Sequence, residues 1–308
     1  MTQTWTLTLK KAEKSNTPMK GLIIKGIGGF YYVDTGSEII EAKGRGIFKK
    51  DGITLAVGDK VELEIIDDAE KKGVINSIYP RKNQFIRPPI ANVDTFVVVF
   101  AASKPKPNLV LVDKFLVMAE MHGVEAVICI NKSDLVSPEV LAEYRAIYGN
   151  IYPVIAVSAR TGEGMDELKQ AVSGKTAALA GPSGVGKSTI INALIPHANM
   201  ETGSISEKTK RGKHTTRHVE IFRADGGGRI FDTPGFTSFE IMEAEEDNLM
   251  HYYPDIDRYS ANCYYDNCRH LKEPSCAVRE ALNEGKIHRL RYESYAANME
   301  EIKNRRKY

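Results

Sequence analysis

Hydrophobic positions in residues 1–88 fall in short runs that show no helical period, and turns rich in glycine, aspartate and lysine separate the runs. Runs of this length bounded by turn residues are typical of β-strands. About five short strands favour a small barrel, with the OB-fold as the leading candidate. The expected strands span residues 19–27, 28–35, 37–44, 59–66 and 73–79. The Arg-Pro-Pro run at 87–89 would break any element and predicts a linker.

After residue 88 the pattern changes. Residues 93–102 form a continuous apolar run, as in a strand that is buried on both faces. Helical and strand-like patterns then alternate, which predicts a parallel sheet with helices on both faces. The other expected strands span residues 125–130, 152–157, 175–180 and 229–231, and the expected helices span 109–123, 137–150, 164–173 and 189–195. Gly123 suits a helix end, and Ser137 followed by Pro138 suits a helix start.

From residue 241 onward the chain is polar and helical in pattern, with a cysteine and histidine cluster inside it. Its tail, residues 285–308, has the pattern of an amphipathic helix with a basic end. We therefore expect a multi-domain protein with an all-β OB-fold barrel over residues 1–88, an α/β domain over 89–240 and a mostly helical domain over 241–308.

Composition and charge narrow the class of protein. Hydrophobic residues make up 42% and charged residues 27%, as in ordinary soluble proteins. The sequence has no apolar run of about 18 residues and no apolar secretory core at its start, so we expect a cytoplasmic protein with no membrane partner. Residues 1–90 hold 15 Lys and Arg against 11 Asp and Glu, and residues 277–308 hold 8 against 5. Basic ends around an acidic centre fit a partner with a phosphate backbone.

A phosphate-binding loop is predicted at residues 181–189, which fit the G-x-x-x-x-G-K-[ST] pattern between an expected strand and an expected helix. Backbone N–H groups of such a loop wrap phosphates, and the helix N-terminus adds partial positive charge. Lys187 would reach the β- and γ-phosphates, and Ser188 would hold Mg²⁺. The candidate nucleotide-binding residues of this loop are Gly181, Pro182, Ser183, Gly184, Val185, Gly186, Lys187, Ser188 and Thr189.

Two further segments complete the expected phosphate end. Asp232 ends an expected strand and would hold Mg²⁺ directly or through water, while Gly235 would place its N–H near the γ-phosphate. Thr215 or Thr216 would close over Mg²⁺ and the γ-phosphate. The residues alone do not choose between the two threonines, and we take Thr216 as the candidate magnesium ligand.

The base end of the site is predicted at two other strand tips. Asn131, Lys132 and Asp134 belong to an Asn-Lys-Ser-Asp run that follows the strand 125–130. Guanine offers N1–H and N2–H₂ as donors, and the Asp134 carboxylate would accept both, which selects guanine over adenine. Asn131 would bridge the base edge and neighbouring loops, and the Lys132 stem would lie on the base face. After the next strand, Ser158 would support the loop and the Ala159 N–H would meet guanine O6.

The order of these motifs is unusual, because the base-reading run precedes the phosphate-binding loop. Small GTPases have the reverse order, so the sequence predicts a circularly permuted P-loop GTPase domain. The same sheet can form because termini of compact domains often lie close together. As a result of the permutation, the segment with Asp232 and Gly235, which is the second switch of a GTPase, leads directly into the C-terminal segment.

A closed metal site is predicted in the C-terminal segment. Cys263, Cys268, His270 and Cys276 have a C-x4-C-x-H-x5-C spacing. Three thiolates and one imidazole are a common structural Zn²⁺ set. Such a site would fold a small module that otherwise lacks a core. The fourth cysteine, Cys129, lies in an apolar run and is interpreted as a core thiol.

Taken together, these motifs resemble the bacterial ribosome small subunit-dependent GTPase A family over nearly the whole chain. The resemblance rests on the strand-rich start with residues 44–59, the permuted order, the Arg-Gly-Lys-His-Thr-Thr run at 211–216 and the cysteine and histidine spacing. It implies an OB-fold, a permuted GTPase domain and a zinc domain. It also implies GTP hydrolysis stimulated by the 30S subunit and a role in late 30S maturation through 16S rRNA. A monomer is expected.

Basic residues make an RNA partner physically reasonable, because phosphate neutralisation dominates such binding. They lie at an expected barrel loop and in the segment around Thr215 and Thr216: Lys43, Arg45, Lys49, Lys50, Lys208, Lys210, Arg211, Lys213 and Arg217. Phe30, Tyr31 and Tyr32 offer a stacking face, although alternation along a strand would place at least one of them in the barrel core.

The residue that activates water is not identified by the sequence. Ras-like enzymes carry a glutamine that orients water directly after the glycine that corresponds to Gly235, whereas this chain has Phe236 at that position. His214 is one candidate, with rRNA contact or loop packing as the alternative. Two other functions stay open: a GTP-dependent RNA-binding scaffold with little hydrolysis, and a permuted GTPase that acts on another RNA such as tRNA.

Overall fold

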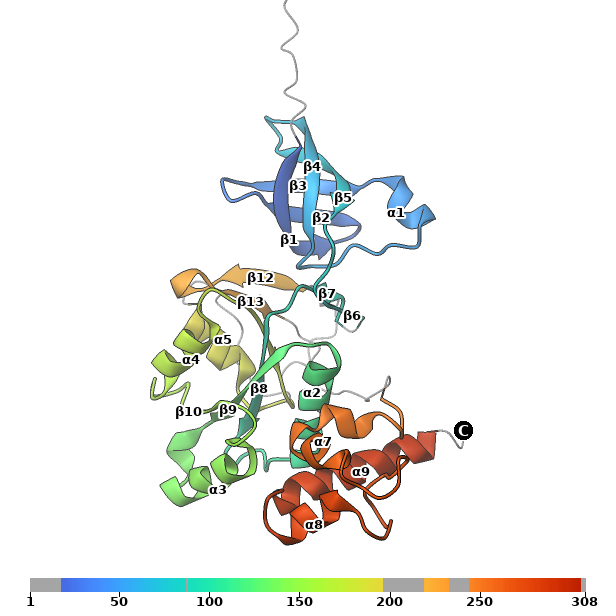
Figure 1. The fold of residues 1–308 in the computed structure, drawn as a ribbon. Helices are drawn as coiled ribbons and strands as arrows, with labels where there is room; N and C mark the ends of the chain where they lie inside the picture. The colour runs from blue at the N-terminus through green and yellow to red at the C-terminus, as the bar shows by residue number, and fades with distance from the viewer. Residues whose placement is uncertain (1–17, 87, 196–218, 233–243, 306–308) are drawn as a thin grey trace, which may run out of the picture.

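The computed structural model describes residues 18–86, 88–195, 219–232 and 244–305. Three parts follow one another in Figure 1: a barrel at one end, a central sheet flanked by helices, and a helical C-terminal part at the other end. The domain limits predicted above remain predictions.

The N-terminal part is a five-stranded barrel, and all five predicted strands are confirmed. It closes because β1 pairs antiparallel with both β2 and β4, while β3 pairs parallel with β5. Apolar side chains such as Ile23, Val33 and Leu63 fill the interior and are fully buried. The strands are β1 (Met19–Ile27), β2 (Phe30–Asp34), β3 (Ile39–Gly44), β4 (Lys60–Asp67) and β5 (Lys72–Ile78).

A short helix between β3 and β4 was not predicted. Helix α1 (Gly46–Lys50) has only five residues, too few for a helical period to be visible in the sequence. Its Phe48 is buried in the barrel core, whereas Ile47 stays 54% exposed.

Buried parallel strands form the central sheet, as the apolar runs predict. Its order is β10-β9-β8-β11-β13-β12. All neighbours in it are parallel except β12 and β13. The strands are β8 (Thr95–Ala101), β9 (Glu125–Asn131), β10 (Val154–Val157), β11 (Thr176–Ala180), β12 (Glu220–Arg223) and β13 (Arg229–Asp232).

Helices cover both faces of this sheet, and every residue of β8 is buried as a result. Phe96, Val98 and Phe100 share a core with α2 and α3, whereas Val97 and Val99 share a core with α4 and α5. This period of two is the ordinary alternation of a strand. The helices are α2 (Leu109–Met121), α3 (Pro138–Tyr148), α4 (Met165–Val172) and α5 (Lys187–Leu194), with 3-10 turns η1 (Ser133–Leu135) and η2 (Asp225–Gly227).

Strand β12 departs from the expected all-parallel sheet. It is antiparallel to β13 and also pairs with β1 of the barrel, at Lys25 opposite Glu220. A four-residue strand at a sheet edge carries too short a pattern to be recognised in sequence. Because of it, barrel and central strands form one eleven-stranded sheet, with β12 lying between the two parts in Figure 1.

The predicted linker contains a small hairpin. Strands β6 (Gln84–Phe85) and β7 (Ile90–Ala91) pair antiparallel on either side of the proline run, which lies in neither strand. The Ala91 N–H donates to the Val57 carbonyl at 2.9 Å, so the linker is attached to the barrel.

The C-terminal part has a hydrophobic core of its own, which corrects the expectation that it would lack one. Tyr253, Ile256, Tyr295 and Met299 are fully buried together, and Val117 of α2 joins them. Helix α9 is amphipathic as predicted, with buried positions recurring every three or four residues. The elements are η3 (Leu249–Tyr252), α7 (Pro254–Ser260), α8 (Ala277–Asn283) and α9 (Arg289–Arg305).

A buried ion network attaches this part to the central domain. Arg291 of α9 bonds to Asp113 of α2 at 2.6 Å and to Asp255 of α7 at 2.8 Å. Arg291 is 1% exposed and Asp113 is fully buried. The C-terminal part is therefore docked on α2 by packing and by charge.

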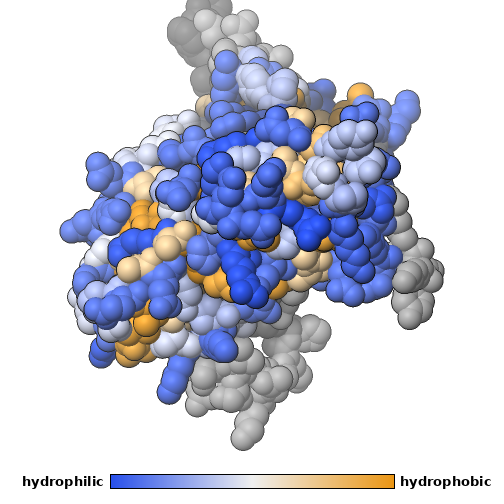
Figure 2. All heavy atoms as spheres, turned by 60° about the horizontal axis from the view of Figure 1, so that its bottom comes forward, coloured by the Kyte–Doolittle hydropathy of each residue, from blue (hydrophilic) through white to orange (hydrophobic). Residues whose placement is uncertain are grey.

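The surface in Figure 2 is mainly hydrophilic, and its hydrophobic residues lie in small separate areas. Within the described ranges, no helix is both long enough and apolar enough to cross a membrane.

Candidate functional site

The residues predicted to bind nucleotide are gathered at one edge of the central sheet. Asn131 ends β9, the Ser158 loop follows β10, the phosphate-binding loop follows β11, and Asp232 ends β13. These four strands run parallel to their neighbours in the β10-β9-β8-β11-β13 series, so their carboxyl ends share one edge. Ligands of open α/β sheets bind at this edge.

Two glycines of the phosphate-binding loop are required by their surroundings. Gly181 has φ +149°, and a Cβ there would lie 2.1 Å from the Val99 carbonyl oxygen. Gly186 has φ +99°, and its Cβ would lie 2.3 Å from Asn131 Nδ2. Any other residue would push this loop off β8 or off Asn131.

Helix α5 begins at Lys187, and Ser188 and Thr189 follow in its first turn. The Lys187 ammonium folds back on its own loop and donates to the Gly181 and Pro182 carbonyls at 2.7 and 2.8 Å. Burial lowers the pKa of Lys187 to about 8. A phosphate would give this desolvated ammonium an opposite charge, which the two carbonyls do not.

Asn131 connects the two ends of the site. Its Nδ2 donates to the Val185 carbonyl at 2.8 Å, and its Oδ1 accepts from the Ala159 N–H at 3.2 Å. The side chain is almost fully buried. The sequence predicted that Asn131 would bridge neighbouring loops, and the structure shows these two bridges.

Lys132 also reaches the phosphate-binding loop. It adopts a left-handed conformation with φ +62°. Its Nζ donates to the Gly184 carbonyl at 2.9 Å and to the Lys104 carbonyl. The long side chain therefore crosses the site between the base end and the phosphate end.

Asp134 lies in η1 and faces Arg160. Arg160 Nη2 donates to Asp134 Oδ2 at 2.7 Å, although the Arg160 side chain is 77% exposed. Hydrogen bonds from Ser158 and Arg160 lower the pKa of Asp134. The carboxylate is thus ionised and accepts hydrogen bonds, which is the state that binding to the N–H donors of guanine would require.

Arg160 is a residue that the sequence analysis did not assign. Its position directly after Ser158 and Ala159 was the available signal, since a cation there lies beside the expected carboxylate. The Lys104 carbonyl was also not assigned, because residue type does not indicate which main-chain carbonyls accept hydrogen bonds.

Asp232 lies at the end of β13, and β13 is the parallel neighbour of β11, which leads into the phosphate-binding loop. The predicted phosphate-end residues His214, Thr215, Thr216 and Gly235 lie outside the described residues.

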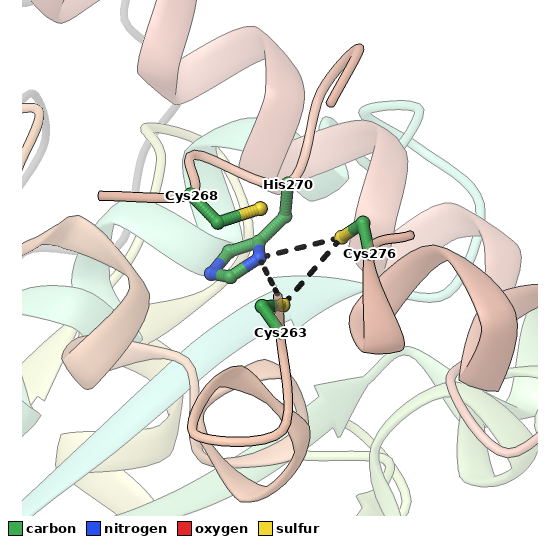
Figure 3. A group of neighbouring side chains, drawn as sticks. All are labelled: Cys263, Cys268, His270 and Cys276. Carbon is green, nitrogen blue, oxygen red and sulfur yellow. Dashed lines mark hydrogen bonds between the residues drawn. The ribbon is translucent and has the colours of Figure 1, made fainter. Parts of the chain in front are cut away.

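The predicted metal ligands come together in the C-terminal part. The ligand atoms of Cys263, Cys268, His270 and Cys276 all lie within 4.8 Å of one another. Figure 3 shows the four side chains converging, with Cys263 beyond the end of α7 and Cys276 at the start of α8. The cluster can hold one metal ion.

The distances in the cluster fit tetrahedral coordination. The Cys263 and Cys276 sulfurs are 3.8 Å apart, and His270 Nδ1 is 3.4 and 3.5 Å from them. A tetrahedron with metal–sulfur bonds of about 2.3 Å has sulfurs about 3.8 Å apart. His270 Nε2 faces Met250 Sδ instead, so Nδ1 is the ligand atom.

Burial shifts the pKa values of the groups in this cluster. Burial raises the pKa of the Cys268 thiol to about 12 and raises that of Cys276. Burial lowers the pKa of His270, which keeps its imidazole neutral. A bound cation reverses the effect on the thiols, because thiolates are its ligands.

A parallel sheet with a phosphate-binding loop after β11, a base-reading run after β9 and a barrel at its edge define a P-loop GTPase with permuted strand order. The chain belongs to the RsgA GTPase family, which matches residues 78–242, and the RsgA N-terminal domain matches residues 20–75. It is therefore a GTP hydrolase.

Relatives and solved structures agree with this assignment. The chain is 47% identical over 290 residues to a protein of Alkaliphilus metalliredigens named small ribosomal subunit biogenesis GTPase RsgA, covering 94% of this chain and 99% of the relative. A protein of the same name from Carboxydothermus hydrogenoformans is 49% identical, covering 92% and 98%. The structure of YjeQ from Thermotoga maritima matches with a TM-score of 0.81 and 34% identity, covering 93% and 99%. YloQ, described as a circularly permuted GTPase, matches with a TM-score of 0.79 and 37% identity, covering 96% and 99%.

Proposed function

We propose that this protein hydrolyses GTP to GDP and phosphate when it engages the small ribosomal subunit, and that it acts in late maturation of that subunit by binding 16S rRNA. It would work as a monomer in the cytoplasm. The names of the relatives support the small-subunit role, and the family supports the hydrolysis.

The observation that carries the nucleotide part is the position of Asn131. One buried side chain ties the phosphate-binding loop to the base-reading loop through Val185 and Ala159. Both halves of the proposed nucleotide site are thereby joined by a side chain of the protein itself. Such preorganisation reduces the ordering cost of binding.

We assign the base to Asp134 and the phosphates to the loop 181–189. Asp134 would exchange the Arg160 hydrogen bond for the N1–H and N2–H₂ donors of guanine. Lys187 would leave its two carbonyl partners for the β- and γ-phosphates. Ser188, Thr216 and Asp232 would hold Mg²⁺, which neutralises charge on the phosphates.

His214, beside Thr215 and Thr216 in the sequence, is the candidate that we carry forward for water activation. Phe236 has no group that orients water, so the isolated protein should turn over slowly. Ordering of the switch segments by the subunit would then raise the rate.

We assign Zn²⁺ to the Cys263 cluster as a structural ion. Three thiols and one imidazole nitrogen leave no position for substrate, and the distances fit that geometry.

The barrel presents a basic surface that suits rRNA. Lys49 and Lys50 end α1 and are exposed. Lys43 Nζ lies 4.3 Å from the centre of the Phe30 ring. Tyr31 packs against the barrel core, as alternation predicted for one of the three aromatics, so Phe30 and the lysines are the better RNA contacts.

The test is steady-state GTP hydrolysis with and without 30S subunits, compared with 50S subunits and tRNA. We expect 30S subunits alone to raise the rate strongly. Lys187→Ala should abolish the rise, while Lys169→Ala, which removes an exposed lysine of α4, should leave it intact.

The two alternatives predict other outcomes. Tight GTP binding with no rise on any RNA would support the scaffold. A rise on tRNA with none on 30S subunits would support a different RNA partner.

A further inference from the structure

A cavity of about 410 Å³, wide open to solvent, lies where the barrel meets the edge of the central sheet, away from the nucleotide loops. The barrel contributes the starts of β1 and β4, and the central sheet contributes β12 and β13. The lining residues with ionisable groups are Lys20, Lys60, Arg223, Arg229, Asp34 and Tyr79.

Positive charge dominates this lining, with four cations against one carboxylate. Asp34 is nearly buried and pairs with Arg223 at 2.6 Å. Lys20, Lys60 and Arg229 form no ion pair in the part of the chain that the structure describes. Glu62 is the register partner of Lys20, and Asp94 lies within electrostatic range of Lys60, but neither carboxylate lines the cavity.

The two arginines face each other across β12 and β13, because Arg223 is the register partner of Arg229. Like charges directly opposite in an antiparallel pair destabilise it. Asp34 forms an ion pair with Arg223, and its charge also interacts with that of Arg229, which forms no ion pair among the described residues. The Arg229 Nε is buried without a hydrogen-bond partner among the described residues, although a buried polar atom ordinarily has one.

The direction of the Asp34 pKa agrees with a positive lining. Burial alone would raise the pKa of its carboxyl, yet hydrogen bonds from Arg223 and the Gly36 N–H, with the charges of Arg223 and Arg229, hold the pKa below its ordinary value. The cavity favours anionic groups.

From these observations we infer that the cavity is an anion site that takes a phosphate group, held by Lys20 and Lys60 of the barrel and by Arg223 and Arg229 of the central sheet. The phosphate comes either from a free phosphorylated small molecule or from an RNA backbone. Because its ligands belong to both parts, an occupied site would tie the barrel to β12 and β13.

The experiment uses the full chain saturated with GDP and Mg²⁺, so that the phosphate-binding loop is filled. Binding of radiolabelled inorganic phosphate is measured by equilibrium dialysis, and binding of a short single-stranded RNA by fluorescence anisotropy over a salt series. The double variant Lys60→Gln, Arg229→Gln is compared with Lys72→Gln, Lys175→Gln, which removes two exposed lysines outside the cavity. GDP affinity and melting temperature check folding, and Lys60→Gln alone, at an exposed position, serves if the double variant is unstable.

We expect the Lys60→Gln, Arg229→Gln variant to bind phosphate about tenfold or more weakly, because each substitution removes a charge-assisted hydrogen bond to the phosphate. That loss with unchanged RNA binding identifies a free phosphorylated ligand. If RNA affinity falls instead, and the slope of log affinity against log salt falls by about one per removed cation, the phosphate belongs to RNA. Equal behaviour of the two double variants in both assays overturns the inference.

Discussion

Asp134 and Arg160 form an ion pair in the proposed base-binding site. The Arg160 guanidinium donates an N–H to the carboxylate, and guanine would offer N–H donors of the same kind. The Arg160 side chain is largely exposed, so exchanging it for the base returns a cation to water at little cost. In the proposed site, specificity for guanine would depend on this carboxylate, which accepts hydrogen bonds and never donates them.

Asp134→Asn should therefore weaken GTP binding by about tenfold or more, because a hydrogen-bonded charge is lost. Binding of xanthosine triphosphate should be retained, since xanthine replaces the N2–H₂ donor by a carbonyl that the amide can meet. Fluorescent-nucleotide titrations measure both affinities. Equal losses for the two nucleotides would contradict the base-reading role.

At the scale of elements, two ion networks connect parts that are distant in sequence. Arg291 joins α9 to α2 and α7 in a buried network. At the other end, Arg223 of β12 joins Asp34 of β2, and Lys25 of β1 joins Glu220 of β12 at 2.7 Å. Ion pairs therefore connect the central domain to the barrel through β12 and to the C-terminal part through α2, in addition to hydrophobic packing.

Replacing Arg291 with Met should destabilise the docked C-terminal part by about 3–5 kcal/mol, because Asp113 and Asp255 are left buried without a counter-charge. Calorimetry should show an earlier thermal transition. Adding Asp113→Asn and Asp255→Asn should restore part of the loss. Arg289→Ala, which removes an exposed pair with Glu293, should cost only about a few tenths of a kcal/mol.

The Asp34 pair predicts an acid dependence of stability. Its pKa in the folded protein lies below the ordinary 3.8, so its stabilisation is complete above that value and is lost as pH falls through the folded-state pKa. Wild-type stability should thus fall more steeply below about pH 4 than that of Asp34→Asn. Urea midpoints at several pH values test this, and parallel curves for the two proteins would show that the pair contributes nothing.

At the scale of the whole molecule, the Cys263 cluster and the C-terminal core are in contact. The four residues of the cluster lie between α7 and α8, and Cys268 and Cys276 are also part of that core. Helix α9 contacts the cluster loop through Tyr292, which donates to the His270 carbonyl, but it also packs on Tyr253 and α2, away from the cluster. Loss of the proposed metal should therefore unfold the cluster loop before it releases α9.

Metal removal with a thiol reagent and a chelator should release one Zn²⁺ per chain, and hydrogen exchange should rise over residues 263–276 while α9 stays protected. Cys268→Ser should lose the metal, because it removes one ligand. Cys129→Ala should keep it, since Cys129 lies in the buried sheet. Loss of protection throughout α9 would show that the core depends on the metal.

How much the sequence predicts follows from how local each signal is. The barrel strands, the buried strands β8 and β9 and the amphipathic α9 each have a hydrophobic pattern that lies within one element. Such a pattern can be read along the chain without knowledge of the fold. The nucleotide loops and the Cys263 set are short motifs whose spacing carries their chemistry. Even the permutation is visible, because motif order is a property of the chain alone.

Only the tertiary structure decides what depends on partners far apart in sequence. Examples are the pairing of β12 with β1, the Arg291 network and the Arg160 contact to Asp134. In each of them, the residue types in the sequence do not indicate which distant residue is the partner. The same holds for the cavity between barrel and sheet, where cations from four strands meet. Their common physical reason is that burial, field and hydrogen-bond partners are set by the folded arrangement, whereas period and motif spacing are set by the sequence itself.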